Sequence, residues 1–171
     1  MITPTEINAY LGVIEHQDQE KWSWSHVADK QYWRVKFSGA LPACEINLEL
    51  SGPYLCLQID MRAVRVKPEC REIFQFFLLR LNDDLPLVKF GLAENGGVEL
   101  MAETMADQIG LNTFEELLRG VIAVFLQYRR EIELLATDIE LANLLSKPFE
   151  TARGPTVSVV LVKPEPQNVN S

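Results

Sequence analysis

Apolar and polar residues alternate on both sides of the turn sequence Asn95-Gly96-Gly97. The apolar positions are Val88, Phe90 and Leu92 before the turn, and Val98, Leu100 and Ala102 after it. This pattern predicts a β-hairpin. A two-residue turn would set apolar side chains opposite polar ones, because a one-residue slip moves every side chain to the other face. We therefore predict a three-residue loop, Glu94-Asn95-Gly96, with a left-handed glycine bulge and with Phe90 opposite Leu100.

Alternation also marks four runs before this hairpin. It is typical of strands with one buried and one solvated face, and hence of an antiparallel sheet with helices on one side. The predicted fold class is α+β, in the order α-β-β-β-(β)-α-β-β-α. The four runs lie at Trp22–Ser25, Trp33–Phe37, Cys44–Leu50 and Leu55–Met61.

Helical spacing of apolar residues predicts the remaining elements. The first helix begins at a capping box formed by Thr3 and Glu6, and it ends near residue 15. The second extends over Pro68–Asn82. The third begins at Asn112 or Thr113, where acidic residues are placed for a second capping box. Those acidic residues are Glu115 and Glu116.

The C-terminal part differs from the rest of the chain. A third helix continued to Leu145 would span roughly 50 Å, more than the width of a small domain. The sequence Thr137-Asp138-Ile139-Glu140 can cap a new helix, so we predict a separate short one over Asp138–Leu145. Thr156–Val162 is β-prone, and it could add a strand or pack over apolar surface. We predict a domain over residues 1–136 and an appendage, with a flexible end, over residues 137–171.

Charge and composition exclude several classes of function. The formal net charge of −8 argues against binding to nucleic acid or to an anionic membrane surface. No apolar run approaches the ~20 residues of a membrane span. The first residues have no basic start or apolar stretch of a secretory signal. The cysteines Cys44, Cys56 and Cys70 form no metal-binding pattern, so we expect free thiols in a cytoplasmic protein.

Motifs for chemistry are lacking. Neither His16 nor His26 has other ligands at metal-binding spacing, and the sequence contains no nucleophile elbow or phosphate-binding glycine loop. We expect no catalytic residue, no metal and no cofactor. An enzyme with a dispersed carboxylate site stays open as an alternative, because general acid–base work needs carboxylates that converge in a cleft. Its residues would be Asp60, Glu99 and Glu103.

Surplus apolar residues give the candidate binding site. Phe76 and Leu79 fall outside the apolar stripe of the second helix. Such surplus indicates a partner, unless a loop or the C-terminal segment of the chain covers it. Trp22 and Trp24 are either core residues or interface anchors, because tryptophan is common in binding hot spots. The candidate protein interface is therefore Phe76, Leu79, Trp22 and Trp24.

Three segments carry a resemblance to a known family: Phe76–Leu92, Asn95–Leu100 and Leu111–Arg129. Over residues 3–136 the chain resembles the YbjN family, a group of proposed bacterial sensory transduction regulators with the fold of type III secretion chaperones. The resemblance implies a sheet with the first and third helices on one face and the second helix apart. Chaperones of this fold are small acidic homodimers that bind extended segments of other proteins.

The expected function is that of a non-enzymatic protein-binding module, chaperone-like or regulatory, which acts as a homodimer. A small-ligand sensor with a cavity between sheet and helices is the alternative, ahead of the carboxylate enzyme. The sequence leaves open the partner, the signal, the role of residues 146–171 and the surface that forms the dimer.

Overall fold

The computed structural model describes residues 1–144 except 19–20, 28–29, 40–42, 94 and 108. Its elements follow the predicted α+β order, with the optional fourth strand present. The elements are α1 (Pro4–Gln17), β1 (Trp22–His26), β2 (Tyr32–Phe37), β3 (Cys44–Ser51), β4 (Tyr54–Arg65), the 3₁₀ turn η1 (Pro68–Cys70), α2 (Arg71–Asp84), β5 (Val88–Leu92), β6 (Gly97–Met105) and α3 (Leu111–Thr137).

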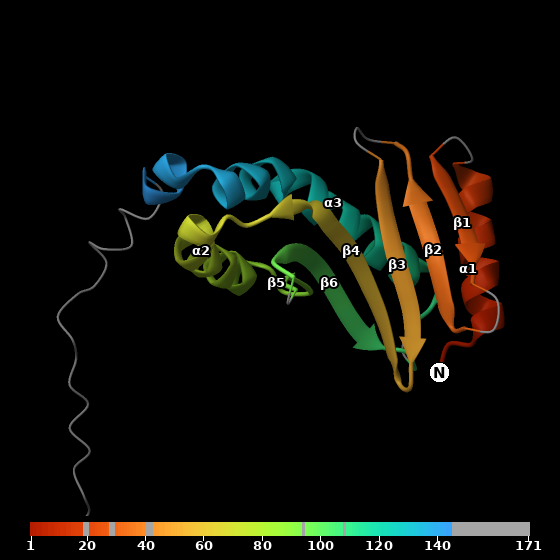
Figure 1. Ribbon diagram of the computed structural model, residues 1–171. Helices are drawn as coiled ribbons and strands as arrows, with labels where there is room; N and C mark the ends of the chain where they lie inside the picture. The colour runs from red at the N-terminus through yellow and green to blue at the C-terminus, as the bar shows by residue number, and fades with distance from the viewer. Residues whose placement is uncertain (19–20, 28–29, 40–42, 94, 108, 145–171) are drawn as a thin grey trace, which may run out of the picture.

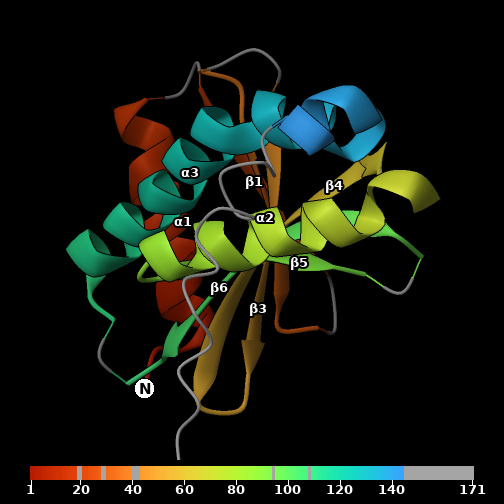
Figure 2. The same cartoon turned by 90° about the vertical axis from the view of Figure 1, so that its left-hand side faces the viewer.

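In the described part of the chain, six strands form one antiparallel sheet in the order β1-β2-β3-β4-β6-β5. Helices α1 and α3 cover one face of this sheet, α1 against β1 and α3 against β4 and β6 (Figure 1). Helix α2 lies apart, against the edge strand β5 (Figure 2). The predicted arrangement, with helices on one face and the second helix apart, is confirmed.

The predicted alternation holds in the strands. In β2, Trp33 and Val35 are buried while Arg34 is exposed, and β3 repeats the pattern from Cys44 to Ser51. The buried side chains lie beneath α1 and α3, and the Trp33 indole N–H donates to Asn8 Oδ1 of α1 at 2.7 Å. This bond fixes α1 to the sheet.

The hairpin of β5 and β6 has the predicted register. Phe90 pairs with Leu100, and the N–H groups of Ala93 and Gly96 close the turn by donating to Gly97 O and Ala93 O, each at 2.9 Å. Gly96 has a φ of 77°, the left-handed conformation that the prediction requires. Glu94, the first residue of the predicted loop, lies outside the described residues. Apolar side chains of β5 and β6 therefore share the core face.

The helix starts agree with the prediction only in part. Thr3 and Glu6 form the predicted capping box of α1. The capping box predicted for α3 is wrong, because the helix begins at Leu111 after Gly110 and has no side-chain cap. Both Asn112 and Thr113 lie within its first turn, where neither can be an N-cap.

The predicted break after α3 is present. The N–H groups of Glu140 and Leu141 donate to the Asp138 carboxylate at 3.0 and 3.1 Å, so Asp138 caps a new short helix over residues 139–144. Ala142 in this helix is buried and belongs to the main core. Leu145, the predicted strand Thr156–Val162 and the remainder of the tail lie outside the described residues.

Candidate functional site

The outward face of α2 carries two large apolar side chains. Phe76 is 56% exposed and Leu79 is 64% exposed. They lie between the exposed residues Glu72 and Asp83, on one side of the helix, because residues three or four positions apart are neighbours on a helix surface. We call Glu72, Phe76, Leu79 and Asp83 the α2 stripe. It has an apolar centre and a carboxylate at each end.

The opposite side of α2 is already occupied. Phe74, Leu78 and Leu81 are buried, and the helix contacts β5 through this side. As far as the described residues go, the α2 stripe therefore remains free for a second contact. Burying a large apolar side chain fully yields about 1.5–3 kcal/mol, so covering both Phe76 and Leu79 would supply a useful part of a binding energy.

Helix α2 is held rigidly enough to present this stripe. The half-buried Asn82 side chain accepts from Phe90 N–H at 2.8 Å and donates to Phe90 O at 2.9 Å. Lys89 Nζ donates to the carbonyls of Asn82 and Leu85 at the end of the helix. These bonds fix the C-terminal end of α2 to the edge of the sheet, and a preorganised surface loses less entropy when it binds.

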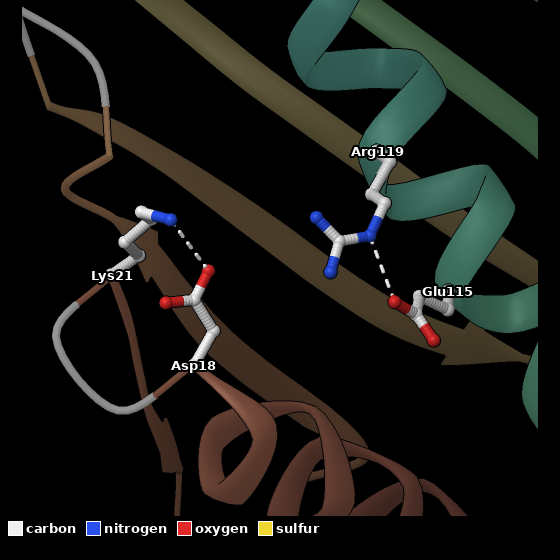
Figure 3. Close-up of polar contacts among 4 residues, drawn as sticks. All are labelled: Asp18, Lys21, Glu115 and Arg119. Carbon is white, nitrogen blue, oxygen red and sulfur yellow. Dashed lines mark hydrogen bonds and ion pairs between the residues drawn. The ribbon is translucent and has the colours of Figure 1, made fainter.

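The two tryptophans of the candidate interface lie on the inner side of β1. Trp22 is 4% exposed, and Trp24 packs against the core as a partly buried residue. The Arg119 guanidinium of α3 lies over the Trp22 ring, 5.6 Å from its centre, and Glu115 accepts from Arg119 Nε at 2.8 Å. Figure 3 shows this ion pair beside the one that joins Asp18 to Lys21, just before β1. Trp22 thus offers little surface to a partner.

Metal-binding geometry does not occur in the described part of the chain, where no three His, Cys, Asp or Glu side chains gather. His26 stacks on Trp33, with ring centres 4.9 Å apart, and its Nε2 lies 2.7 Å from Lys30 O. Among the described residues, no helix is long and apolar enough to cross a membrane.

The cysteines are free thiols in environments that suppress the thiolate. Burial raises the pKa of Cys44 to about 12, with a smaller effect of the neighbouring Glu45. Burial and then the Glu103 carboxylate raise the pKa of Cys56, which lies on the outer sheet face and donates to Glu103 at 3.7 Å. A nucleophilic cysteine needs a lowered pKa, so this geometry suits packing and not catalysis.

The carboxylates of the alternative enzyme site lie on the outer face of the sheet. Asp60 of β4 is opposite Glu99 of β6, and Glu103 is opposite Cys56. Asp60 lines two open hollows, each of about 320 Å³. One of them lies between the ends of β3 and β4 and the C-terminal half of α3. Its walls include the apolar residues Ile59, Met61, Val64 and Phe125 and the ion pair Arg129–Glu133.

The sequence reasoning found the centre of the α2 stripe and missed its surroundings. Leu87, which follows α2 in the chain, and Leu144, at the end of the short helix over residues 139–144, are both more than half exposed. Helical spacing of apolar residues does not identify these two positions, because Leu87 follows a helix and Leu144 is the last described residue of one. The sequence predicted a cavity between sheet and helices for the sensor alternative, but not the apolar walls of the hollow beside α3, since these come from distant segments that each read as ordinary core.

The arrangement is that of an α+β protein with an open antiparallel sheet, two helices on one face and a third at the edge. No family model matches the sequence, and no curated protein does. Solved structures do match. YbjN of E. coli, described as a proposed transcription regulator, aligns with a TM-score of 0.51 and 12% identity over 84% of this chain and 94% of its own.

A second match is the structure of the ExsC–ExsE complex, with a TM-score of 0.47 and 20% identity over 81% of this chain and 99% of that one. The likeness to YbjN confirms the predicted YbjN-like fold. At such low identity it shows the fold alone, because one fold hosts many functions.

Proposed function

We propose that this protein is a non-enzymatic protein-binding module, chaperone-like or regulatory, which acts in the cytoplasm as a homodimer. The observation that carries this proposal is the α2 stripe, with Phe76 and Leu79 exposed on a helix whose other side packs against the core. Exposed apolar side chains on a rigid helix are typical of protein interfaces, and a catalytic site has no need of them.

The stripe also suits a contact between two copies. In a twofold dimer the same patch meets itself, so Phe76 of one copy packs on Leu79 of the other. Antiparallel helices would bring Glu72 of one copy toward Asp83 of the other. Helices that cross at about 50° meet only near their centres, which keeps these like charges apart.

The test is the oligomeric state of a Phe76→Asp variant. We expect the wild type to be a dimer by light scattering at micromolar concentration and the variant to be a monomer. A charged residue in the middle of an apolar contact loses the burial energy and adds a desolvation cost. The matched control is Leu126→Asp, on an exposed position of α3. A monomeric wild type, or a variant that remains dimeric, would show that α2 is not the interface.

The second candidate function is a small-ligand sensor, and the hollow between the ends of β3 and β4 and helix α3 supports it. Its volume of about 320 Å³ is at the lower end of the range for ligand sites, and apolar walls with one ion pair are a usual lining. Thermal-shift screening against metabolites tests this function. Shifts that disappear in a Met61→Trp variant, which fills the hollow, would favour it over the first.

A further inference from the structure

The described structure ends beside α2. Helix α3 and the short helix over residues 139–144 lie next to the start of α2, where Lys67 N–H donates to Ala136 O at 2.9 Å. Both views place this short helix alongside α2 (Figures 1 and 2). Leu144, the last described residue, is 61% exposed. The tail of the chain therefore starts next to α2, the helix whose stripe the described residues leave uncovered.

The tail is long enough to reach every part of α2. Eleven residues, 145–155, separate Leu144 from the apolar run Thr156–Val162. Fully extended they span about 36 Å, whereas α2 with its 14 residues is about 21 Å long. The apolar run itself would extend over about 23 Å, close to the length of the helix.

The chemistry of the tail complements the stripe. Thr156–Val162 (TVSVVLV) contains four valines and one leucine, and Arg153 and Lys163 lie on its two sides. Residues 145–171 contain three of the 16 Lys and Arg residues and two of the 24 Asp and Glu residues. The tail therefore carries a small net positive charge, whereas the rest of the chain is strongly negative. The apolar centre of the stripe is flanked by Glu72 and Asp83.

We propose that the segment Thr156–Val162 docks on the α2 stripe of its own chain and competes there with the protein partner. This inference rests on the proposed function, since it names a segment of the chain that regulates the same surface. A tethered segment has an effective concentration of about 1 mM. If its intrinsic dissociation constant is about 0.1 mM, the ratio of docked to undocked tail is about ten. The docked tail would then weaken the binding of a partner to one stripe by about tenfold.

Photo-crosslinking in the full chain tests the docking. Phe76 is replaced by p-benzoylphenylalanine, which keeps an aromatic ring, and ¹⁴N- and ¹⁵N-labelled chains are mixed at 1 µM before irradiation (about one-hundredth of the assumed dissociation constant). We expect crosslinks from position 76 to residues 154–163 of the same isotope. The control is the same probe at position 126 on α3. Absence of tail crosslinks from position 76, or equal tail crosslinks from position 126, would overturn the proposal.

Two full-length variants test the competition. Val159→Asp with Leu161→Asp places charges in the apolar run, and Gln167→Asp with Val169→Asp adds the same charge outside it. We expect the first pair to tighten dimerisation by about a hundredfold, measured by sedimentation, because each of the two copies must release a tail that weakens binding about tenfold. We expect the second pair to leave dimerisation unchanged. Equal effects of the two pairs would refute competition.

The failure of this inference is distinguishable from the failure of the proposed function. A chain that dimerises through Phe76 but shows no intrachain crosslinks keeps the proposed function and loses the inference. A chain that is monomeric at every concentration yet shows those crosslinks loses the homodimer and keeps the docked tail.

Discussion

Cys44 gives the sharpest expectation for a single residue. Its side chain is buried at the start of β3, and burial raises its pKa from the ordinary value of 9.0 to about 12. Below pH 9 the thiol is protonated in both the folded and the unfolded chain, so its full contribution to stability is present. Above pH 9 the unfolded chain loses the proton and the folded chain keeps it, so stability falls until the pH passes about 12.

We predict that the unfolding free energy drops by about 1–2 kcal/mol more in the wild type than in Cys44→Ala between pH 8 and pH 10.5. Urea titrations at both pH values measure this difference. The control is Cys56→Ala, which should change the pH dependence less, because the Cys56 side chain is only partly buried. Identical pH dependence in the wild type and Cys44→Ala would contradict the raised pKa.

Single residues also show what the sequence could reveal about the site. Phe76 and Leu79 were found because helical spacing separates the two faces of one helix, and both are exposed. The two tryptophans could not be assigned, because alternation in a strand defines two faces without saying which one is buried. Burial of Trp22 beneath Arg119 depends on α3, almost a hundred residues later in the chain.

At the scale of elements, the edge strand β5 depends on α2 for its hydrogen bonding. The N–H and C=O groups of Phe90 point away from β6 and bond to the side chain of Asn82. Free groups on an edge strand invite pairing with other chains, and covering them is a common protection. Asn82 thus closes part of the sheet edge and fixes the helix that carries the α2 stripe.

We predict that Asn82→Ala costs about 1–3 kcal/mol of unfolding free energy, because two backbone groups lose their partner. Chemical denaturation measures the loss. Gln75→Ala, on an exposed position of the same helix, should stay within about 0.5 kcal/mol of the wild type. If the two variants are equally stable, the Asn82 bonds do not hold α2 to the sheet.

The elements themselves were mostly predictable from sequence. The hairpin register followed from the requirement that apolar residues of β5 and β6 share a face, and Phe90 does lie opposite Leu100. The break at Asp138 followed from its capping sequence. The start of α3 did not, because Gly110 begins the helix without a side-chain cap and leaves no capping signature. The position of α2 was predicted from the family resemblance, because periodicity identifies the apolar face of a helix but not the element against which that face packs.

For the whole molecule, the net charge of −8 and the apolar stripe impose opposite demands on association. Net charge keeps chains apart, whereas the exposed apolar pair on α2 favours contact. A dimer through α2 resolves the conflict if the helices cross near Phe76 and Leu79 while most of the acidic surface stays apart.

Such a dimer links stability to concentration. Each tenfold rise in protein concentration stabilises a dimer by about 1.4 kcal/mol relative to two unfolded chains, because the native state alone associates. We predict that the urea midpoint of the wild type rises by about 0.4 M for each tenfold increase between 1 and 100 µM. The midpoint of Phe76→Asp should stay constant over that range, and that of Leu126→Asp should follow the wild type. A wild-type midpoint independent of concentration would mean that the folded chain stands alone, and Phe76 and Leu79 would then be left to the tail or to a different protein.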